Sequence, residues 1–302
     1  MSIIRTVLGD IDPINLGFTL LHEHLLTAPP GESDPDLEMP SLDAAIEELR
    51  AYHALGGSAL VEMTPRDYGR NAEGEAEVSR ASGVHVIAVT GFIKGEFAEA
   101  IVEPLTIQAI AEEMIHDIQQ GFGTSPVRAG VIKAGSSKNR LTPNEEKVFR
   151  AAAIAHRETG APISTHTEAG TMALEQISLL RAEGVLPSSI LIGHCDRNLE
   201  WDYHLAIAST GVYMGYDQFS KTKYNSDEER VAFITRMISA GHRDQLCISG
   251  DLARQSNWRS YGGSPGLAHI PQTVVPMLRN AGLNDDHLDA LFKHTPARFL
   301  AF

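Results

Sequence analysis

Short apolar runs rich in valine, isoleucine and threonine alternate with longer amphipathic segments along this chain, and this alternation constrains its fold most strongly. The eight runs are residues 16–21, 58–64, 84–91, 127–134, 162–166, 189–194, 211–216 and 245–250. Strands that are apolar throughout, with helices between them, indicate a parallel sheet covered by helices. Eight such units favour an α/β fold of the closed (β/α)₈ or TIM-barrel type over an open doubly wound sheet.

The segments between the runs carry helix signals. One begins at Ser41, a favourable N-cap, and repeats apolar residues every three or four positions. Another has Thr142 as its cap and Pro143 at the first helical position, where proline is favoured. The same pattern recurs at 171–183, 227–240 and 271–281. No linker or break in composition interrupts the 302 residues, so we expect one domain spanning residues 1–302.

Composition and charge exclude several classes of function. The formal net charge is −14, and no cluster of lysine and arginine could form the positive face that nucleic-acid binding needs. No run of about 18 apolar residues is present, and the first residues lack the apolar core of a signal peptide, so no membrane span or leader is expected. Two cysteines, Cys195 and Cys247, make no disulfide framework, which favours the cytoplasm. Glycine-rich phosphate fingerprints are absent, which argues against a nucleotide-binding sheet.

Unusual polar residues stand at the ends of five of the eight runs. The first run ends in His22-Glu23-His24, and its two histidines, two positions apart, share one face of a strand. The other runs end in Lys133, His166, His194 and Asp251. Because the carboxyl ends of barrel strands meet at one mouth, we expect these side chains to gather there.

These residue types suit a metal centre. Imidazole and carboxylate groups bind divalent cations such as zinc, manganese and cobalt. The chain has no paired cysteines of the kind that a thiolate site requires. A single histidine in an apolar strand is more often a satisfied core residue than a ligand, but the conjunction at five strand ends favours a metal centre. Lys133 is hard to explain by packing alone, because an unpaired buried ammonium is costly. With a lowered pKa it could become a carbamate that bridges two cations, or it could form a Schiff base as in a barrel aldolase or isomerase.

Five segments, in order along the chain, resemble motifs of the phosphotriesterase family of the amidohydrolase superfamily. They are GFTLLHEHL at 17–25, RAGVIKAG at 128–135, PISTHT at 162–167, IGHCD at 192–196 and TPARFL at 295–300. The second resembles the strand that carries the family's carbamylated lysine. The resemblance extends from about Ile14 to Leu300. One departure is Phe92, which stands where many lactonases of the family have tyrosine, so a contact made there by a hydroxyl is missing.

The resemblance implies two divalent cations, zinc in the first place, with manganese or cobalt as alternatives. The more buried ion would take His22, His24 and Asp251, and the more exposed ion His166 and His194. Carbamylated Lys133 (N6-carboxylysine) and a hydroxide would bridge the two ions. Asp251 would accept the proton of the hydroxide and pass it to the leaving group, which makes Asp251 and Lys133 the expected catalytic residues.

Family membership does not fix the substrate, and we expect a lactonase acting on a sugar-type lactone, phosphorylated or otherwise anionic. The expected substrate-binding residues are Lys221, Lys223, Arg254, Tyr261, Phe92 and Trp258. Several cations at the mouth of an acidic protein would attract an anion, although they could equally be solvated loop charges. The alternatives are a phosphotriesterase, carboxylesterase or amidase of the same family, and a metal-containing binding protein without turnover. The expected partner is a small-molecule substrate, without nucleic acid or membrane, and a homodimer is suggested by family resemblance only.

Overall fold

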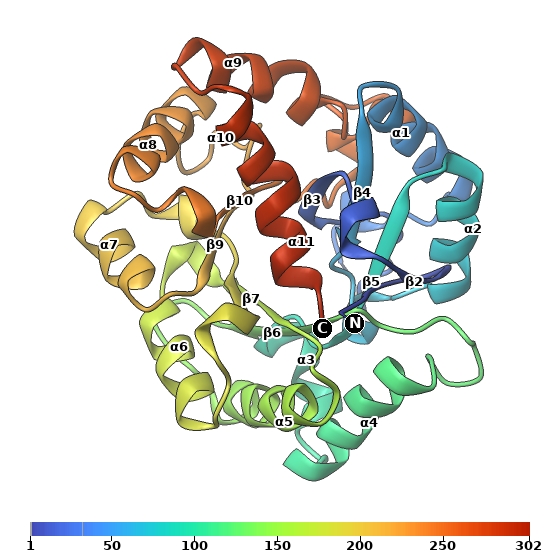
Figure 1. The fold of residues 1–302 in the computed structure, drawn as a ribbon. Coiled ribbons are helices and arrows are strands. Elements are labelled where there is room, and N and C mark those ends of the chain that lie inside the picture. The colour runs from blue at the N-terminus through green and yellow to red at the C-terminus, as the bar shows by residue number, and fades with distance from the viewer. Residues whose placement is uncertain (1, 32) are drawn as a thin grey trace.

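Eight parallel strands of the computed structural model curl into a nearly closed barrel surrounded by helices (Figure 1). The structure describes residues 2–31 and 33–302. Within them the strands follow one another around the sheet in chain order, from β3 to β10, and every neighbouring pair is parallel. The prediction of a (β/α)₈ barrel is confirmed.

The barrel strands correspond to the eight predicted runs. They are β3 (Phe18–Glu23), β4 (Gly57–Glu62), β5 (His85–Gly91), β6 (Val131–Ser136), β7 (Ile163–Thr167), β8 (Ile190–Ile192), β9 (Tyr213–Tyr216) and β10 (Leu246–Ile248). The fourth run was placed too early, at 127–134. Residues 127–130 belong to the preceding loop, where the N–H of Ala129 donates to the carbonyl of Asp117.

Most of the helices cover the outside of the barrel, and α11 lies across one end of it. They are α1 (Leu42–Ala54), α2 (Ala72–Ser82), α3 (Gly95–Val102), α4 (Ile107–Gln119), α5 (Pro143–Thr159), α6 (Ala173–Ala182), α7 (Trp201–Ser209), α8 (Asp227–Ser239), α9 (Val275–Asn280), α10 (Asp285–Asp289) and α11 (Thr295–Leu300). The Ser41 and Thr142 hydroxyls cap α1 and α5, as expected, and Thr142 also forms a capping box with Glu145. None of the described helices is long and apolar enough to cross a membrane.

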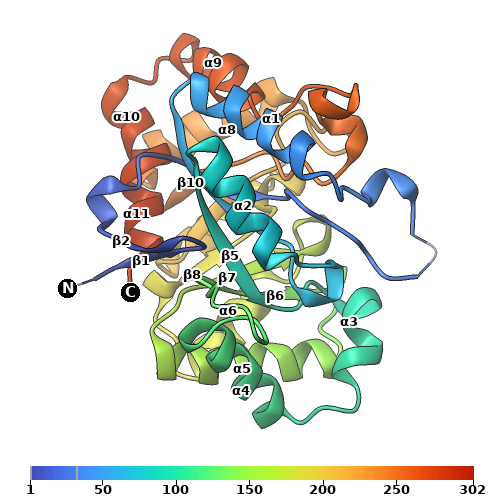
Figure 2. The same cartoon turned by 90° about the vertical axis from the view of Figure 1, so that its right-hand side faces the viewer.

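Alternating side chains of the strands build two apolar layers. Leu20 and Leu60 belong to the layer between sheet and helices, whereas Leu21 and Val61 belong to the cluster inside the barrel. Burying each such side chain contributes roughly 1.5–3 kcal/mol. The inner cluster is closed at one end by an N-terminal hairpin, β1 (Ile4–Thr6) and β2 (Gly9–Ile11), and by α11, as Figure 2 shows beside the two termini. The opposite end is left for a site.

The barrel closes through polar contacts between β3 and β10 rather than through a β-ladder, which the described residues lack at this seam. The N–H of His22 donates to the Ser249 hydroxyl over 2.9 Å, and the N–H of Asp251 donates to the His22 carbonyl over 3.1 Å. The buried carboxylate of Glu23 accepts from the N–H groups of Gly250 and Leu252 at 2.6 and 3.0 Å. The first and last barrel strands are thus fixed at their carboxyl ends.

Candidate metal centre and active site

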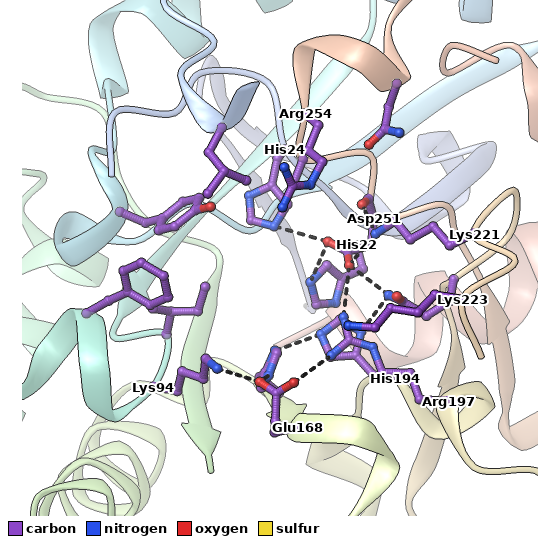
Figure 3. Close-up of a pocket in the computed structure, with 18 of the residues that line it drawn as sticks. His22, His24, Lys94, Glu168, His194, Arg197, Lys221, Lys223, Asp251 and Arg254 are labelled. Atoms are coloured by element: carbon purple, nitrogen blue, oxygen red, sulfur yellow. Dashed lines mark hydrogen bonds and ion pairs between the residues drawn. The ribbon is translucent and has the colours of Figure 1, made fainter. Parts of the chain in front are cut away.

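The predicted ligands lie together at the carboxyl-terminal mouth of the barrel, and Figure 3 shows four of them, His22, His24, His194 and Asp251. One cavity of about 420 Å³ is lined by His22, His24, Lys133, His166, His194 and Asp251. The first two come from the end of β3 and the residue directly after it. Lys133 comes from the middle of β6 and His166 from the end of β7, and the last two come from the segments that follow β8 and β10. All six are buried, so their polar atoms need partners inside the protein or in a bound ligand.

Three ligand atoms come from the end of β3 and the loop after β10. Nε2 of His24 lies 3.3 Å from Oδ1 of Asp251, and Nε2 of His22 lies 3.8 Å from the same oxygen. One ligand atom from each of these residues lies within 4.8 Å of the other two. Burial lowers the pKa of His22 to about 4, so this imidazole is neutral and has a lone pair to offer. Two imidazoles with one carboxylate fit a divalent cation.

A second pair of ligand atoms comes from β7 and the turn after β8. Nδ1 of His166 and Nε2 of His194 are 2.8 Å apart. Burial lowers the pKa of His166 to about 3 and holds that of His194 well below its usual value, so both rings are neutral. Such a pair either shares one proton in a hydrogen bond or presents two lone pairs to a cation. This pair therefore fits a second divalent ion.

Lys133 projects from β6 into the same cavity. Its Nζ lies 3.3 Å from Nε2 of His22. Burial lowers the pKa of Lys133 to about 8, although the negative charges of Asp251 and Asp217 act in the opposite direction. A share of the amine is therefore uncharged near neutral pH, which is the form that reacts with carbon dioxide. The residues present thus fit two cations together with a carboxylated lysine.

The two oxygens of Asp251 face different groups. Oδ1 lies beside His22 and His24, whereas Oδ2 accepts hydrogen bonds from Nε2 of Gln218 and Nζ of Lys221, both at 2.7 Å. Burial acts to raise the pKa of Asp251, but Lys221 and the neighbouring histidines hold it well below its usual value. The Asp251 backbone has a φ of 49°, a strained conformation for a residue other than glycine, and its N–H bond across the seam holds it there.

Comparison with known proteins identifies the family. Residues 2–300 match the model of the phosphotriesterase family. The chain belongs to the phosphotriesterase family. This is a family of binuclear metal hydrolases, and the histidine and aspartate groups at the mouth of the barrel agree with that chemistry.

Three relatives illustrate the range of the phosphotriesterase family. A lactonase from Listeria monocytogenes of known structure is 36% identical, with a TM-score of 0.94 over 99% of each chain. The phosphotriesterase homology protein of Escherichia coli, crystallised with phosphate in its active site, is 35% identical, with a TM-score of 0.91 over 96% of this chain and 100% of that one. A phospho-furanose lactonase from Mycoplasmopsis synoviae is 31% identical over 99% of this chain and 91% of its own length. This member of the phosphotriesterase family is a hydrolase acting on ester bonds.

Only half of the expected substrate-binding residues reach the cavity of this phosphotriesterase-family protein. Lys221, Lys223 and Arg254 line it. Phe92, Trp258 and Tyr261 do not line it. Lys221 bonds to Asp251, and Arg254 forms ion pairs with Asp34 and Asp36 of the loop before α1.

Phe92, Trp258 and Tyr261 were expected at the cavity and lie elsewhere. Phe92 packs in the apolar layer between sheet and helices. Trp258 is fully buried, and its indole N–H donates to the Leu252 carbonyl over 3.0 Å, so it covers its own loop. The Tyr261 hydroxyl accepts from the N–H of Ser41, the cap of α1.

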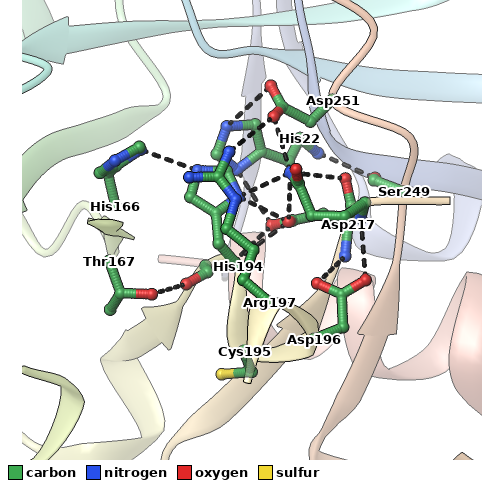
Figure 4. Close-up of polar contacts among 12 residues, drawn as sticks. His22, His166, Thr167, His194, Cys195, Asp196, Arg197, Asp217, Ser249 and Asp251 are labelled. Atoms are coloured by element: carbon green, nitrogen blue, oxygen red, sulfur yellow. Dashed lines mark hydrogen bonds and ion pairs between the residues drawn. The ribbon is translucent and has the colours of Figure 1, made fainter. Parts of the chain in front are cut away.

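Asp217, the first residue after β9, is a candidate functional residue that the sequence pattern alone did not indicate (Figure 4). Its Oδ1 accepts from Nδ1 of His194 over 2.6 Å, and its Oδ2 lies 3.3 Å from Nδ1 of His22. It also accepts from the N–H of His194. Asp217 thereby orients two ligand rings so that their Nε2 atoms face the cavity. The available signal was its position: an acidic residue directly follows the seventh predicted strand.

Two further side chains orient the remaining histidines. The Thr64 hydroxyl lies 2.8 Å from Nδ1 of His24, and Glu168 Oε2 lies 3.3 Å from Nε2 of His166. Glu168 also accepts a 2.5 Å hydrogen bond from Nζ of Lys94. Three of the four candidate ligand histidines therefore have a hydrogen-bond partner on the nitrogen turned away from the ligand face, as is typical of metal-binding histidines. Nδ1 of His22 has only the 3.3 Å ion-pair contact with Asp217 among the described residues.

Proposed function

We propose that this protein is a lactonase that opens sugar-type lactones carrying an anionic group, such as a phosphate ester. The observation that carries the proposal is the position of Lys221, Lys223 and Arg254 on the wall of the cavity that holds the candidate metal ligands. In a protein with a formal charge of −14, cations gathered at one concave site favour an anionic ligand. The lactonase from Listeria monocytogenes, the phospho-furanose lactonase and the phosphate-containing Escherichia coli structure support the same substrate class.

The proposed cofactor is a pair of divalent cations, zinc in the first place and manganese or cobalt as alternatives. His22, His24 and Asp251 would hold one ion, and His166 and His194 the other. Carboxylated Lys133 and a hydroxide would lie between them. When bound, the ions lower the pKa of water and polarise the ester carbonyl.

The chain's own residues supply the rest of the chemistry. Asp251, ionised and facing the cavity, accepts the proton of the attacking water and returns it to the ring oxygen that leaves. Lys221 and Gln218 bond to Oδ2 of this carboxylate and so fix its orientation. Lys223 and Arg254 hold the anionic group of the substrate at a distance from the reacting carbon. Water and lactone are consumed, and one hydroxy acid is formed.

The test compares a phosphorylated sugar lactone with the same lactone lacking phosphate, using protein loaded with zinc, manganese or cobalt. We expect the phosphorylated substrate to have a kcat/KM at least about 100-fold higher, because two or three charge-assisted bonds are lost without the phosphate. Lys223→Met should remove most of this preference, whereas Lys138→Met, at another exposed lysine, should not. A higher kcat/KM for neutral apolar lactones would overturn the proposal that the substrate is anionic.

The same screen should include a phosphotriester, a simple carboxyl ester and an amide. Turnover of one of these without any lactone turnover would identify one of the family alternatives. Stoichiometric metal binding without any turnover would indicate a binding protein. One domain spanning residues 1–302, a small-molecule partner without nucleic acid or membrane, a homodimer and a cytoplasmic location remain proposals alongside this activity.

A further inference from the structure

Arg197 lines the cavity with hydrogen-bond donors that the described protein leaves unused. It ends the short turn Cys195–Arg197 after β8, three residues beyond His194. Its side chain is 12% exposed. Among the described residues, its ion-pair partners are Oδ2 of Asp251 at 3.6 Å and Oε1 of Glu168 at 3.8 Å, and both oxygens lie beyond hydrogen-bond reach. Its Nε is fully buried, and no described residue accepts a hydrogen bond from it.

Another buried arginine shows what a purely structural guanidinium looks like in this fold. Arg230 is fully buried and donates to Asp196 over 2.8 Å, to the Asn225 carbonyl over 2.8 Å and to the Lys221 carbonyl over 2.9 Å. Buried donors are nearly always satisfied in this way, because each one left without an acceptor costs free energy. The open donors of Arg197 therefore indicate that a ligand completes its hydrogen bonding.

The place of Arg197 shows which part of a ligand it would meet. The carboxylates beside it belong to the reaction centre, since Asp251 is a candidate metal ligand and Glu168 contacts His166. Figure 3 shows Arg197 next to His194. Arg254, by contrast, is 43% exposed, and Lys223 is exposed as well. Arg197 thus lies beside the candidate metal ligands, while these two residues lie at the more exposed part of the cavity wall.

We propose that Arg197 binds an oxygen substituent on the carbon next to the reacting carbonyl, and so makes the site specific for hydroxylated lactones. This inference rests on the proposed lactonase function. The planar guanidinium offers several N–H donors to a hydroxyl oxygen of a sugar lactone. A lactone without that hydroxyl would leave the donors unpaired in a buried place, and sites built to bond a substrate hydroxyl reject analogues that lack it strongly.

The test uses two phosphorylated lactones that differ only in the hydroxyl next to the carbonyl. The wild-type enzyme should prefer the hydroxylated lactone by at least about 100-fold in kcat/KM. In Arg197→Met the rate on the hydroxylated lactone should fall about 100-fold and the rate on the deoxy lactone less than about threefold, so that the preference disappears. Lys223→Met is the matched control and should lower both rates equally. Equal loss on both lactones in Arg197→Met, or no preference in the wild type, would overturn the inference.

A binding measurement separates this inference from the lactonase proposal. Calorimetric titration of the metal-loaded protein with the 2-hydroxy sugar acid and with its 2-deoxy counterpart needs no turnover. We expect the hydroxy acid to bind at least about tenfold more tightly, and Arg197→Met to abolish that difference. If no lactone is hydrolysed but the difference is found, the lactonase proposal fails and the role of Arg197 stands. Arg197→Lys keeps the positive charge and so controls for misfolding caused by loss of that charge. Its preference for the hydroxy acid should lie between those of the wild type and Arg197→Met.

Discussion

Nδ1 of His194 donates a 2.6 Å hydrogen bond to the carboxylate of Asp217, which fixes which nitrogen of that ring faces the cavity. The same carboxylate lies 3.3 Å from Nδ1 of His22 on β3, so one side chain contacts a candidate ligand of each proposed ion. Burial acts to raise the pKa of Asp217, but the two histidines hold it well below its usual range. The charge of Asp217 is therefore part of the arrangement of the metal centre.

Replacement of Asp217 by Asn should weaken metal binding by about 10–100-fold, because a neutral amide orients one ring at most and no longer increases the basicity of the ligands. Competition with a chromophoric chelator would measure both binding steps. Asp202→Asn, at an exposed position on α7, is the charge-matched control and should bind like the wild type. Unaltered affinity in Asp217→Asn would mean that the metal ligands are oriented without it.

Replacement of Asp251 by Asn tests the assigned proton acceptor. The amide keeps the shape and one oxygen, so we expect at least one metal ion to remain bound. It cannot take up the proton, and kcat should fall by at least about 100-fold. Metal analysis and steady-state kinetics on the same sample would separate the two effects. A variant that binds metal and turns over normally would remove the role given to Asp251.

The lowered pKa of Lys133, about 8 and caused mainly by burial, predicts a pH dependence for assembly of the metal centre. Carbamate formation uses the neutral amine, whose share increases as the pH rises through about 8. At a fixed concentration of dissolved carbon dioxide, reconstitution of chelator-treated protein should be about tenfold faster at pH 9 than at pH 7. Lys133→Glu, which carries its own carboxylate, should reconstitute without carbon dioxide. A wild-type rate that does not respond to carbon dioxide would count against the carbamate.

Arg254 shares its guanidinium with Asp34 over 2.7 Å, so this carboxylate competes with an anionic substrate. Asp34→Asn should lower the KM for a phosphorylated lactone several-fold, because the guanidinium loses a negative neighbour. The KM for the corresponding neutral lactone serves as the internal control and should stay constant. An equal change for both lactones would show that Asp34 acts on the shape of the loop instead.

The ion pair between Arg230 and Asp196 should be important for stability, since both side chains are fully buried and 2.8 Å apart. Arg230→Met leaves Asp196 without a cation and should destabilise the protein by about 3–5 kcal/mol. Lys293→Met breaks an exposed pair with Asp289 and should cost less than about 1 kcal/mol. Urea unfolding of the metal-loaded protein would measure both. Similar losses in the two variants would contradict this difference.

The gathering of the candidate ligands at one mouth could be predicted because it depends on topology more than on detail. In a parallel barrel the last residues of every strand lie at the same mouth. A correct assignment of the strands was therefore enough to predict that His166 and Asp251, 85 positions apart in the sequence, lie near each other. The hydrophobic runs supplied that assignment. The same reasoning could have included Asp217, which also follows a strand. Its hydrogen bond with Nδ1 of His194, however, depends on strand register and side-chain direction, which the sequence pattern does not show.

The residues on the loops could not be placed in the same way. Trp258 and Tyr261 follow the last strand closely, yet loop backbone turned both of them away from the cavity. Arg197 was overlooked because nothing in the sequence distinguishes an arginine with satisfied donors from one with open donors. That difference depends on distances to carboxylates that come from other strands.

The seam between β3 and β10 makes the metal centre sensitive to opening of the barrel. Backbone bonds at His22 and Asp251 hold the two strands together, and the side chains of the same residues belong to one proposed ligand group. Ions that bind only the closed form would raise the free energy of every opening that parts these strands, and this free energy increases with the logarithm of the ion concentration. Amide exchange at His22 and Gly250 should therefore be an early reporter of metal release, before any helix on the outside loosens.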